Sequence, residues 1–178
     1  MREIDIVILE KGRFNFIDKI IEDLNKNTDE VNFKKVSTTG FFNQLDVNGL
    51  ISSIEIIIGN HYLDAMICAG LWDLVKSSLI FIWKNVQDKK MAIIKGNEIK
   101  ENEDISLSFK IGNLDFKMPN DFSDDLKEKF IDNAFELSKQ YYNEKGKHIV
   151  FYDKESDSFK IKEYNELLRE IAKEKMNS

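Results

Sequence analysis

The sequence is poor in the residues that build the commonest metal, disulfide and phosphate sites. Cys68 is its one cysteine, so the chain can form neither an internal disulfide nor a zinc site with several cysteine ligands. With 2 histidines, carboxylates would have to supply most ligands of any transition-metal site, and no ligand spacing is present. The glycines are scattered and form none of the known phosphate-binding motifs. We therefore expect neither a metal nor a cofactor.

Arginine is also scarce, and the overall charge is acidic. The chain has 26 Lys and Arg residues against 32 Asp and Glu, a net charge of −6. Only Arg2, Arg13 and Arg169 carry the guanidinium group that suits bidentate phosphate recognition. Affinity for nucleic acid depends mainly on basic side chains that neutralise phosphates. Because the basic residues here are interleaved with acids, we expect no nucleic-acid partner.

What is present indicates one globular domain over residues 1–178. The 42% of hydrophobic and 33% of charged residues are typical of a folded chain, and no Pro-, Gly- or Ser-rich linker divides it. Charges near the start, at Arg2, Glu3 and Asp5, interrupt any signal-peptide core, so we expect a cytoplasmic protein. The frequent Lys, Asn and Ile residues suggest an AT-rich bacterial genome.

The hydrophobic periodicity predicts a mixture of strands and helices. The clearest element is a hairpin around Gly112–Asn113, which pairs Phe109 with Phe116 on one face and Lys110 with Asp115 on the other. Other patterns predict strands at 3–10, 31–36, 50–58 and 91–95, a charged connector at 96–104, a second hairpin joining 148–153 to 158–162, and helices at 14–26, 122–143 and 163–175.

These elements favour an α+β fold over a doubly wound parallel sheet. We expect a mixed or antiparallel sheet with local hairpins, packed on amphipathic helices around a long apolar central helix at 61–87. The order at the start of the chain allows one strand–helix–strand unit with parallel strands. A ferredoxin-like layer is a faint analogy at the level of the fold and implies no activity.

The central helix has three interpretations. Its apolar stretch is long enough to span a membrane, but Asp73 and Lys76 would lie near the bilayer centre, so we expect no membrane insertion. In the second interpretation the helix is buried in the domain core. In the third, its heptad-like seam forms a self-association interface in a homodimer, with aromatic side chains as anchors. The candidate interface residues are Cys68, Trp72, Leu79 and Trp83.

One local cluster contains the residue types of a catalytic site. His61, Asp64 and Cys68 could share one side of a helix, but two helical turns separate the imidazole from the thiol, too far for a nucleophile and its base. Asn60 as a helix cap and Asp64 near the positive end of the helix explain the same residues without chemistry. The segment 153–157 resembles a calcium loop but lacks the central glycine and the terminal glutamate, so we expect a solvated hairpin loop.

Without a catalytic motif, the sequence predicts a non-catalytic interaction module. It would be a small acidic accessory, regulatory or immunity-type protein that binds a protein partner or a second copy of itself. The alternative is an enzyme of unrecognised type that combines carboxylates with His61 or His148.

Overall fold

The computed structural model describes residues 4–10, 14–37, 53–59, 62–63, 66, 70–95, 98–141 and 144–177, with backbone alone for 91–95, 98–103 and 175–177. The strands are β1 (Ile4–Glu10), β2 (Val31–Ser37), β3 (Ile54–Ile58), β4 (Lys90–Lys95), β5 (Glu98–Asp104), β6 (Leu107–Ile111), β7 (Leu114–Met118), β8 (His148–Asp153) and β9 (Ser158–Glu163). The helices are α1 (Asn15–Asn27), α3 (Trp72–Val86), α4 (Asp124–Gln140) and α5 (Tyr164–Asn177). The fold is α+β, as the sequence predicts.

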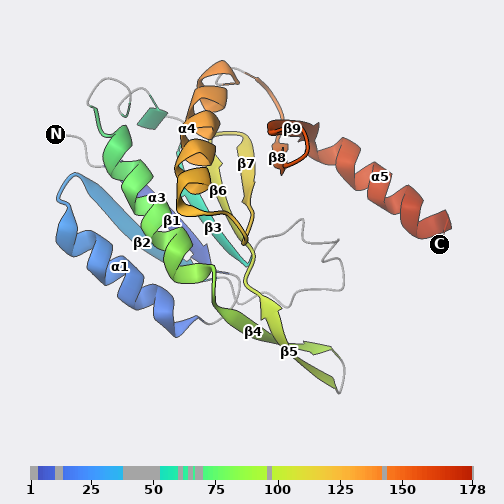
Figure 1. Cartoon of the computed structure of the whole chain (residues 1–178), viewed down its shortest axis with the longest axis horizontal. Coiled ribbons are helices and arrows are strands. Elements are labelled where there is room, and N and C mark those ends of the chain that lie inside the picture. The colour runs from blue at the N-terminus through green and yellow to red at the C-terminus, as the bar shows by residue number, and fades with distance from the viewer. Residues whose placement is uncertain are drawn as a thin grey trace.

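Seven strands form one mixed sheet in the order β2-β1-β3-β6-β7-β8-β9. The pairs β1/β2, β3/β6 and β7/β8 are parallel, and the pairs β1/β3, β6/β7 and β8/β9 are antiparallel. Among the described strands, β4 and β5 pair with each other in a separate two-stranded sheet, which forms an arm that extends from one end of the molecule (Figure 1). Beyond the two predicted hairpins, the sheet therefore contains three strand–helix–strand units with parallel strands.

The three crossover connections do not share one hand. Helices α1, α3 and α4 pack side by side on one face of the sheet (Figure 1). Strands β1 and β7 run in the same direction, yet β1 steps to β2 toward one edge and β7 steps to β8 toward the other. The connections through α1 and α4 must therefore have opposite hands. The one through α4 is left-handed (Figure 1), which is rare because about 98% of such crossovers are right-handed.

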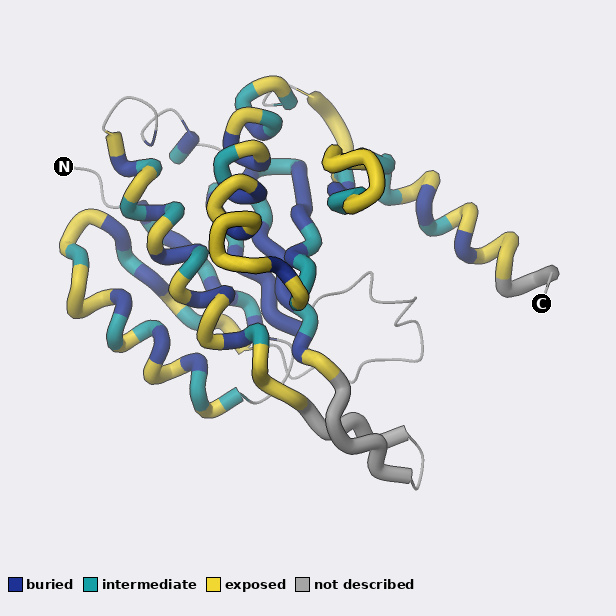
Figure 2. The backbone as a smooth tube through the Cα atoms, in the orientation of Figure 1, coloured by how far each residue is buried: buried dark blue, intermediate teal, exposed yellow. Residues whose placement is uncertain are grey.

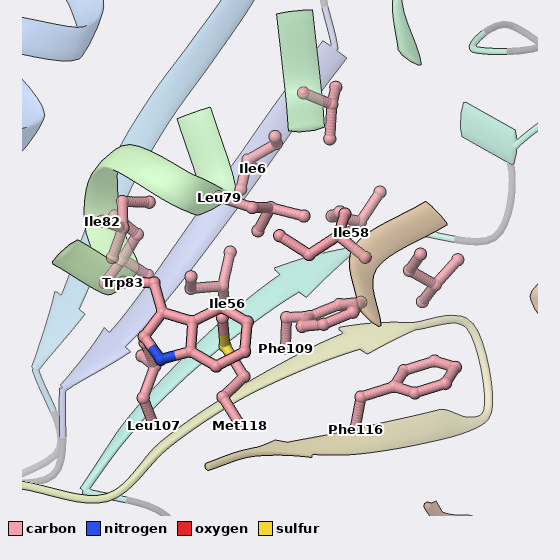
Figure 3. Close-up of a cluster of buried hydrophobic side chains, with 14 of the residues drawn as sticks. Ile6, Ile56, Ile58, Leu79, Ile82, Trp83, Leu107, Phe109, Phe116 and Met118 are labelled. Carbon is pink, nitrogen blue, oxygen red and sulfur yellow. The ribbon is translucent and has the colours of Figure 1, made fainter. Parts of the chain in front are cut away.

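The main core lies between these three helices and the sheet. In register, one apolar row crosses five strands through Ile8, Ile56, Phe109, Phe116 and Val150. The rings of Phe109 and Phe116 stack with centroids 4.9 Å apart. Leu79, Ile82 and Trp83 of α3 point toward the sheet above this row (Figure 3). The outer surfaces of the helices are exposed, so each helix is amphipathic (Figure 2).

The described elements confirm most of the predicted ones, including the register of Phe109 with Phe116 and of Lys110 with Asp115. Ser123 caps α4 by accepting a hydrogen bond from the Leu126 backbone N–H. The segment expected as a charged connector is instead β5, because its backbone pairs with β4.

The predicted long helix is described as α3 over Trp72–Val86. Gly70, just before it, has a φ of +67°, a left-handed conformation that does not continue a helix. The order of the strands does not confirm the ferredoxin-like analogy. Among the described residues, no helix is both long and apolar enough to cross a membrane.

Trp83 is fully buried between α3, α4 and the sheet, and its indole N–H donates to the backbone oxygen of Pro119 at 3.2 Å. We expect Trp83→Ala to lower the free energy of unfolding by about 3–5 kcal/mol, measured by urea denaturation, since it leaves a large cavity. Phe81, two residues earlier on the same helix, is 38% exposed. Phe81→Ala should change stability by less than about 1 kcal/mol. If both variants lost the same free energy of unfolding, the face of α3 that carries Trp83 would not be the one packed in the core.

Candidate functional site

The two faces of the sheet differ in what covers them. The first face carries the apolar row and lies under α1, α3 and α4. On the second face, α5 packs Leu167 and Ile171 against Ile149 and Phe151 at the β8–β9 end. This contact forms a small cluster that is separate from the main core.

A half-exposed apolar patch occupies the second face at the other end of the sheet. Strand alternation places Val7 and Leu9 of β1, Val36 of β2 and Ile57 of β3 on this face. In register, Leu9 lies beside Val36 and Val7 beside Ile57. Val36 is 45% exposed, and the other three are partly exposed. We call these four residues the sheet-face patch.

Beside the patch, buried polar groups lie on β6 and β7. Ser108 is 1% exposed and Asp115 is 3% exposed. The Ser108 hydroxyl and the Oδ1 atom of Asp115 make no hydrogen bond. Asp115 Oδ2 lies 3.5 Å from the Lys117 ammonium and 3.8 Å from that of Lys147. The Lys147 ammonium also lies 4.7 Å from the ring centroid of Tyr164, which connects the cluster to α5.

This polar cluster contains a serine and a lysine, the residue types of one kind of reactive site, but a substrate cannot reach them. Ser108 lies directly opposite Lys117 across the β6/β7 pair, and Asp115 is its diagonal neighbour. A lysine can serve as the base for a serine nucleophile. Here the Ser108 hydroxyl makes no hydrogen bond to the lysine and is almost completely buried, so the described geometry provides no route for a substrate. We therefore interpret the cluster as part of what stabilises the sheet, and not as a catalytic site.

The predicted interface residues separate into three groups. Leu79 and Trp83 lie in the core of the chain. Trp72 is partly exposed, stacks on Phe135 of α4 with ring centroids 3.9 Å apart, and donates to Asp132 at 3.2 Å. Cys68 lies outside the described residues. The seam of α3 thus faces the sheet, and its role in self-association stays a prediction.

Of the two histidines, His148 is described, and it lies directly opposite Glu163 across the β8/β9 pair. Glu163 accepts hydrogen bonds from the Asn165 side chain and the Glu166 backbone N–H at the start of α5. His61 and Asp64 lie outside the described residues. His148 is half-buried at the start of β8, with its ring against Tyr141 and no hydrogen bond to Nδ1. It lies on the first face of the sheet, whereas Asp115 lies on the second.

The segment that resembles a calcium loop is the turn between β8 and β9. Asp153 accepts hydrogen bonds from the Glu155 backbone N–H, the Ser156 hydroxyl and the Lys160 ammonium. Asp157 has a φ of 47° and accepts from Lys129 at 2.8 Å and from the Tyr152 hydroxyl. Among the described residues, no group of His, Cys, Asp and Glu side chains is arranged to hold a metal ion. The solvated hairpin turn is the better description.

A hollow of about 360 Å³ lies between the end of α1 and α3, lined by Lys26, Asn27, Thr28, Asp29, Glu30 and Leu74. Its residues form the end of a helix and the loop after it, and Thr28 accepts from the Glu30 backbone N–H within that loop. The described residues that line it include neither histidine nor cysteine. Its lining indicates a gap between helices and not a catalytic pocket.

Comparison of the chain with protein-family models, curated proteins and solved structures finds no match. The site is therefore interpreted from its own geometry. The sheet-face patch is the feature that sequence reasoning missed, although the period-2 pattern of 3–10 contains its signal. That pattern places Val7 and Leu9 opposite the three isoleucines, but it does not say which face the helices cover.

We expect Asp115→Asn to lower the free energy of unfolding by about 1–3 kcal/mol, because it leaves two lysines beside a buried neutral group. Ser108→Ala removes a hydroxyl without a partner and should cost less than about 1 kcal/mol. The exposed Asp88 gives a matched control in Asp88→Asn, which should leave stability unchanged. Chemical denaturation measures all three. If Asp115→Asn left the free energy of unfolding unchanged, this cluster would not stabilise the sheet.

The Lys160 ammonium, followed by the Ser156 hydroxyl, lowers the pKa of Asp153 from 3.8 to about 2. A carboxyl group with a depressed pKa in the folded state stabilises the protein above its unfolded pKa. We therefore expect the contribution of Asp153 to be complete above about pH 4 and to be lost as the pH falls toward 2. An NMR titration of the carboxyl group measures this pKa, and a value near 4 would contradict the hydrogen bonds of the turn. In Asp153→Asn this component of the acid sensitivity should be absent.

Proposed function

We propose that the protein is a non-catalytic interaction module and that the sheet-face patch binds its protein partner. The observation that carries this proposal is the alignment of four aliphatic side chains on three adjacent strands, on a face that the three core helices do not cover. Apolar groups surrounded by charged residues are typical of protein-binding surfaces. The surrounding charges here are Asp5, Lys34, Glu55 and Lys110, on the same face.

This proposal changes the surface expected from the sequence while keeping the function. Leu79 and Trp83 already pack inside the chain, so their area contributes to folding. Val36, by contrast, is the most exposed of the large hydrophobic residues in the described part of the chain. Within the proposal, the accessory, regulatory or immunity-type role depends on the identity of the partner.

The test compares two single substitutions at similarly exposed aliphatic residues. Val36→Glu places a charge in the patch, and Leu126→Glu places the same charge on α4, where Leu126 is 39% exposed. We expect a protein from the native host to be retained by the wild type and by Leu126→Glu, and to be lost or weakened at least about tenfold with Val36→Glu. Affinity capture with quantitative mass spectrometry measures this.

Circular dichroism and thermal melting of both variants control for folding. Light scattering of the purified protein at several concentrations tests whether the partner is a second copy. Equal retention by Val36→Glu and the wild type would refute the patch as the binding surface.

A further inference from the structure

The two outer edges of the seven-stranded sheet differ in what occupies their backbone groups. Strand β2 forms one edge and β9 the other (Figure 1). On β2, the side-chain amide of Asn25 from α1 binds both backbone groups of Phe33: its Oδ1 accepts from the N–H at 2.9 Å, and its Nδ2 donates to the C=O at 3.0 Å. An edge strand with free backbone groups is a template for another chain. At Phe33 this template is closed by the Asn25 amide.

The backbone groups on the outer edge of β9 are open. His148 lies opposite Glu163, and its N–H donates to the Asn113 backbone oxygen on the β7 side, at 2.9 Å. In an antiparallel pair, two opposite residues either bond each other or both point away. Glu163 therefore points away from β8, and so, by alternation, do Ile161 and Phe159. In the described part of the chain, no hydrogen bond reaches the backbone N–H and C=O groups of Phe159 and Ile161.

The side chains of this edge continue the main core. Phe159 and Ile161 lie on the first face, since Ile161 is opposite Val150 of the apolar row. The ring of Phe159 packs edge-on against Phe130 of α4, with centroids 5.2 Å apart. Both Phe159 and Ile161 are only partly buried. A strand added beside β9 would cover them with its own apolar side chains, so the edge offers both backbone pairing and an apolar contact.

We propose that the outer edge of β9 binds an extended segment of a protein partner, which joins the sheet as a further strand. The backbone of the segment pairs with the N–H and C=O groups of Phe159 and Ile161, and main-chain hydrogen bonds of this kind supply the affinity in strand addition. Every second side chain of the segment is apolar and covers these two residues. The sheet-face patch lies on β1, β2 and β3 at the other end of the sheet, so this inference goes beyond the proposed function and does not depend on it.

A second copy of the chain is a less suitable occupant of this edge. In a two-fold antiparallel pair that sets Ile161 opposite Ile161, Lys160 lies directly opposite Lys162 of the other copy. A shift of two residues in either direction sets one of these lysines opposite itself. Like charges directly opposite each other destabilise a strand pair. A partner strand without lysine at these positions avoids that cost.

The test titrates the ¹⁵N-labelled full-length protein with a capped hexapeptide of alternating threonine and valine, followed by NMR. We expect the amide protons of Phe159 and Ile161 to move downfield in a saturable way as they gain hydrogen bonds. The amide proton of Phe33 should stay unchanged, because the Asn25 side chain already occupies it. The same peptide with every amide N-methylated should bind at least about tenfold more weakly, since it has lost its donors.

A pair of variants at one position completes the test. Ile161→Pro removes an outward N–H, which an edge strand tolerates, and should weaken binding of the peptide about tenfold. Ile161→Val keeps that N–H and should bind as the wild type does. Circular dichroism controls for folding, and the N-methylated peptide gives the same test on the wild type if Ile161→Pro does not fold.

Four results would overturn the inference. They are the absence of saturable shifts at Phe159 and Ile161, equal binding of the N-methylated peptide, equal shifts at Phe33, and shifts confined to the sheet-face patch. Shifts of Phe159 and Ile161 that arise on concentrating the protein alone would also overturn it, in favour of a second copy as the occupant. None of these results bears on the Val36→Glu test of the sheet-face patch.

Discussion

The packing of three helices on a single face of the sheet is the constraint on which the rest of the structure depends. The row from Ile8 through Phe109 to Val150 makes that face apolar across five strands. Phe130 of α4 extends this apolar core, because its ring packs edge-on against Trp83 of α3 with the ring centroids 5.5 Å apart. Because α4 must bury its apolar side chains in this same core, the connection from β7 to β8 passes over the first face. That requirement gives the left-handed crossover.

The same constraint determines what the second face can be. Among the described helices, α1, α3 and α4 lie on the first face, and α5 packs on the second face against β8 and β9. Strands β1, β2 and β3 therefore turn their alternate side chains toward a less covered side. A sheet with one solvated face normally reads as hydrophobic inside and polar outside. Val7, Leu9, Val36 and Ile57 depart from that pattern.

Local sequence signals predicted the elements well because each rests on a few neighbouring residues. The Gly112–Asn113 turn determined the β6/β7 register, and Ser123 marked the start of α4. The parallel pairs were harder to predict, since β3 and β6 are separated by α3 and by the arm of β4 and β5. The segment 96–104 was expected as a connector because its many charged residues hide the strand pattern. Its part 98–104 is recognised as a strand by its pairing with β4. The patch required both the register and the choice of covered face, which no local pattern contains.

The lysines of the second face can be read in two ways, and burial decides between them. Lysine on a sheet is often a solvated side chain that discourages aggregation of an exposed strand. That explanation suits the outer strands β2 and β9, where Lys34, Lys160 and Lys162 lie. It does not extend to Lys110 and Lys117, which lie on the interior strands β6 and β7 beside buried carboxylates. Interior strands have no free edge to protect. Lys110 lies directly opposite Asp115 and the Lys117 ammonium lies 3.5 Å from its carboxylate, so these two lysines balance a charge that is buried on the second face.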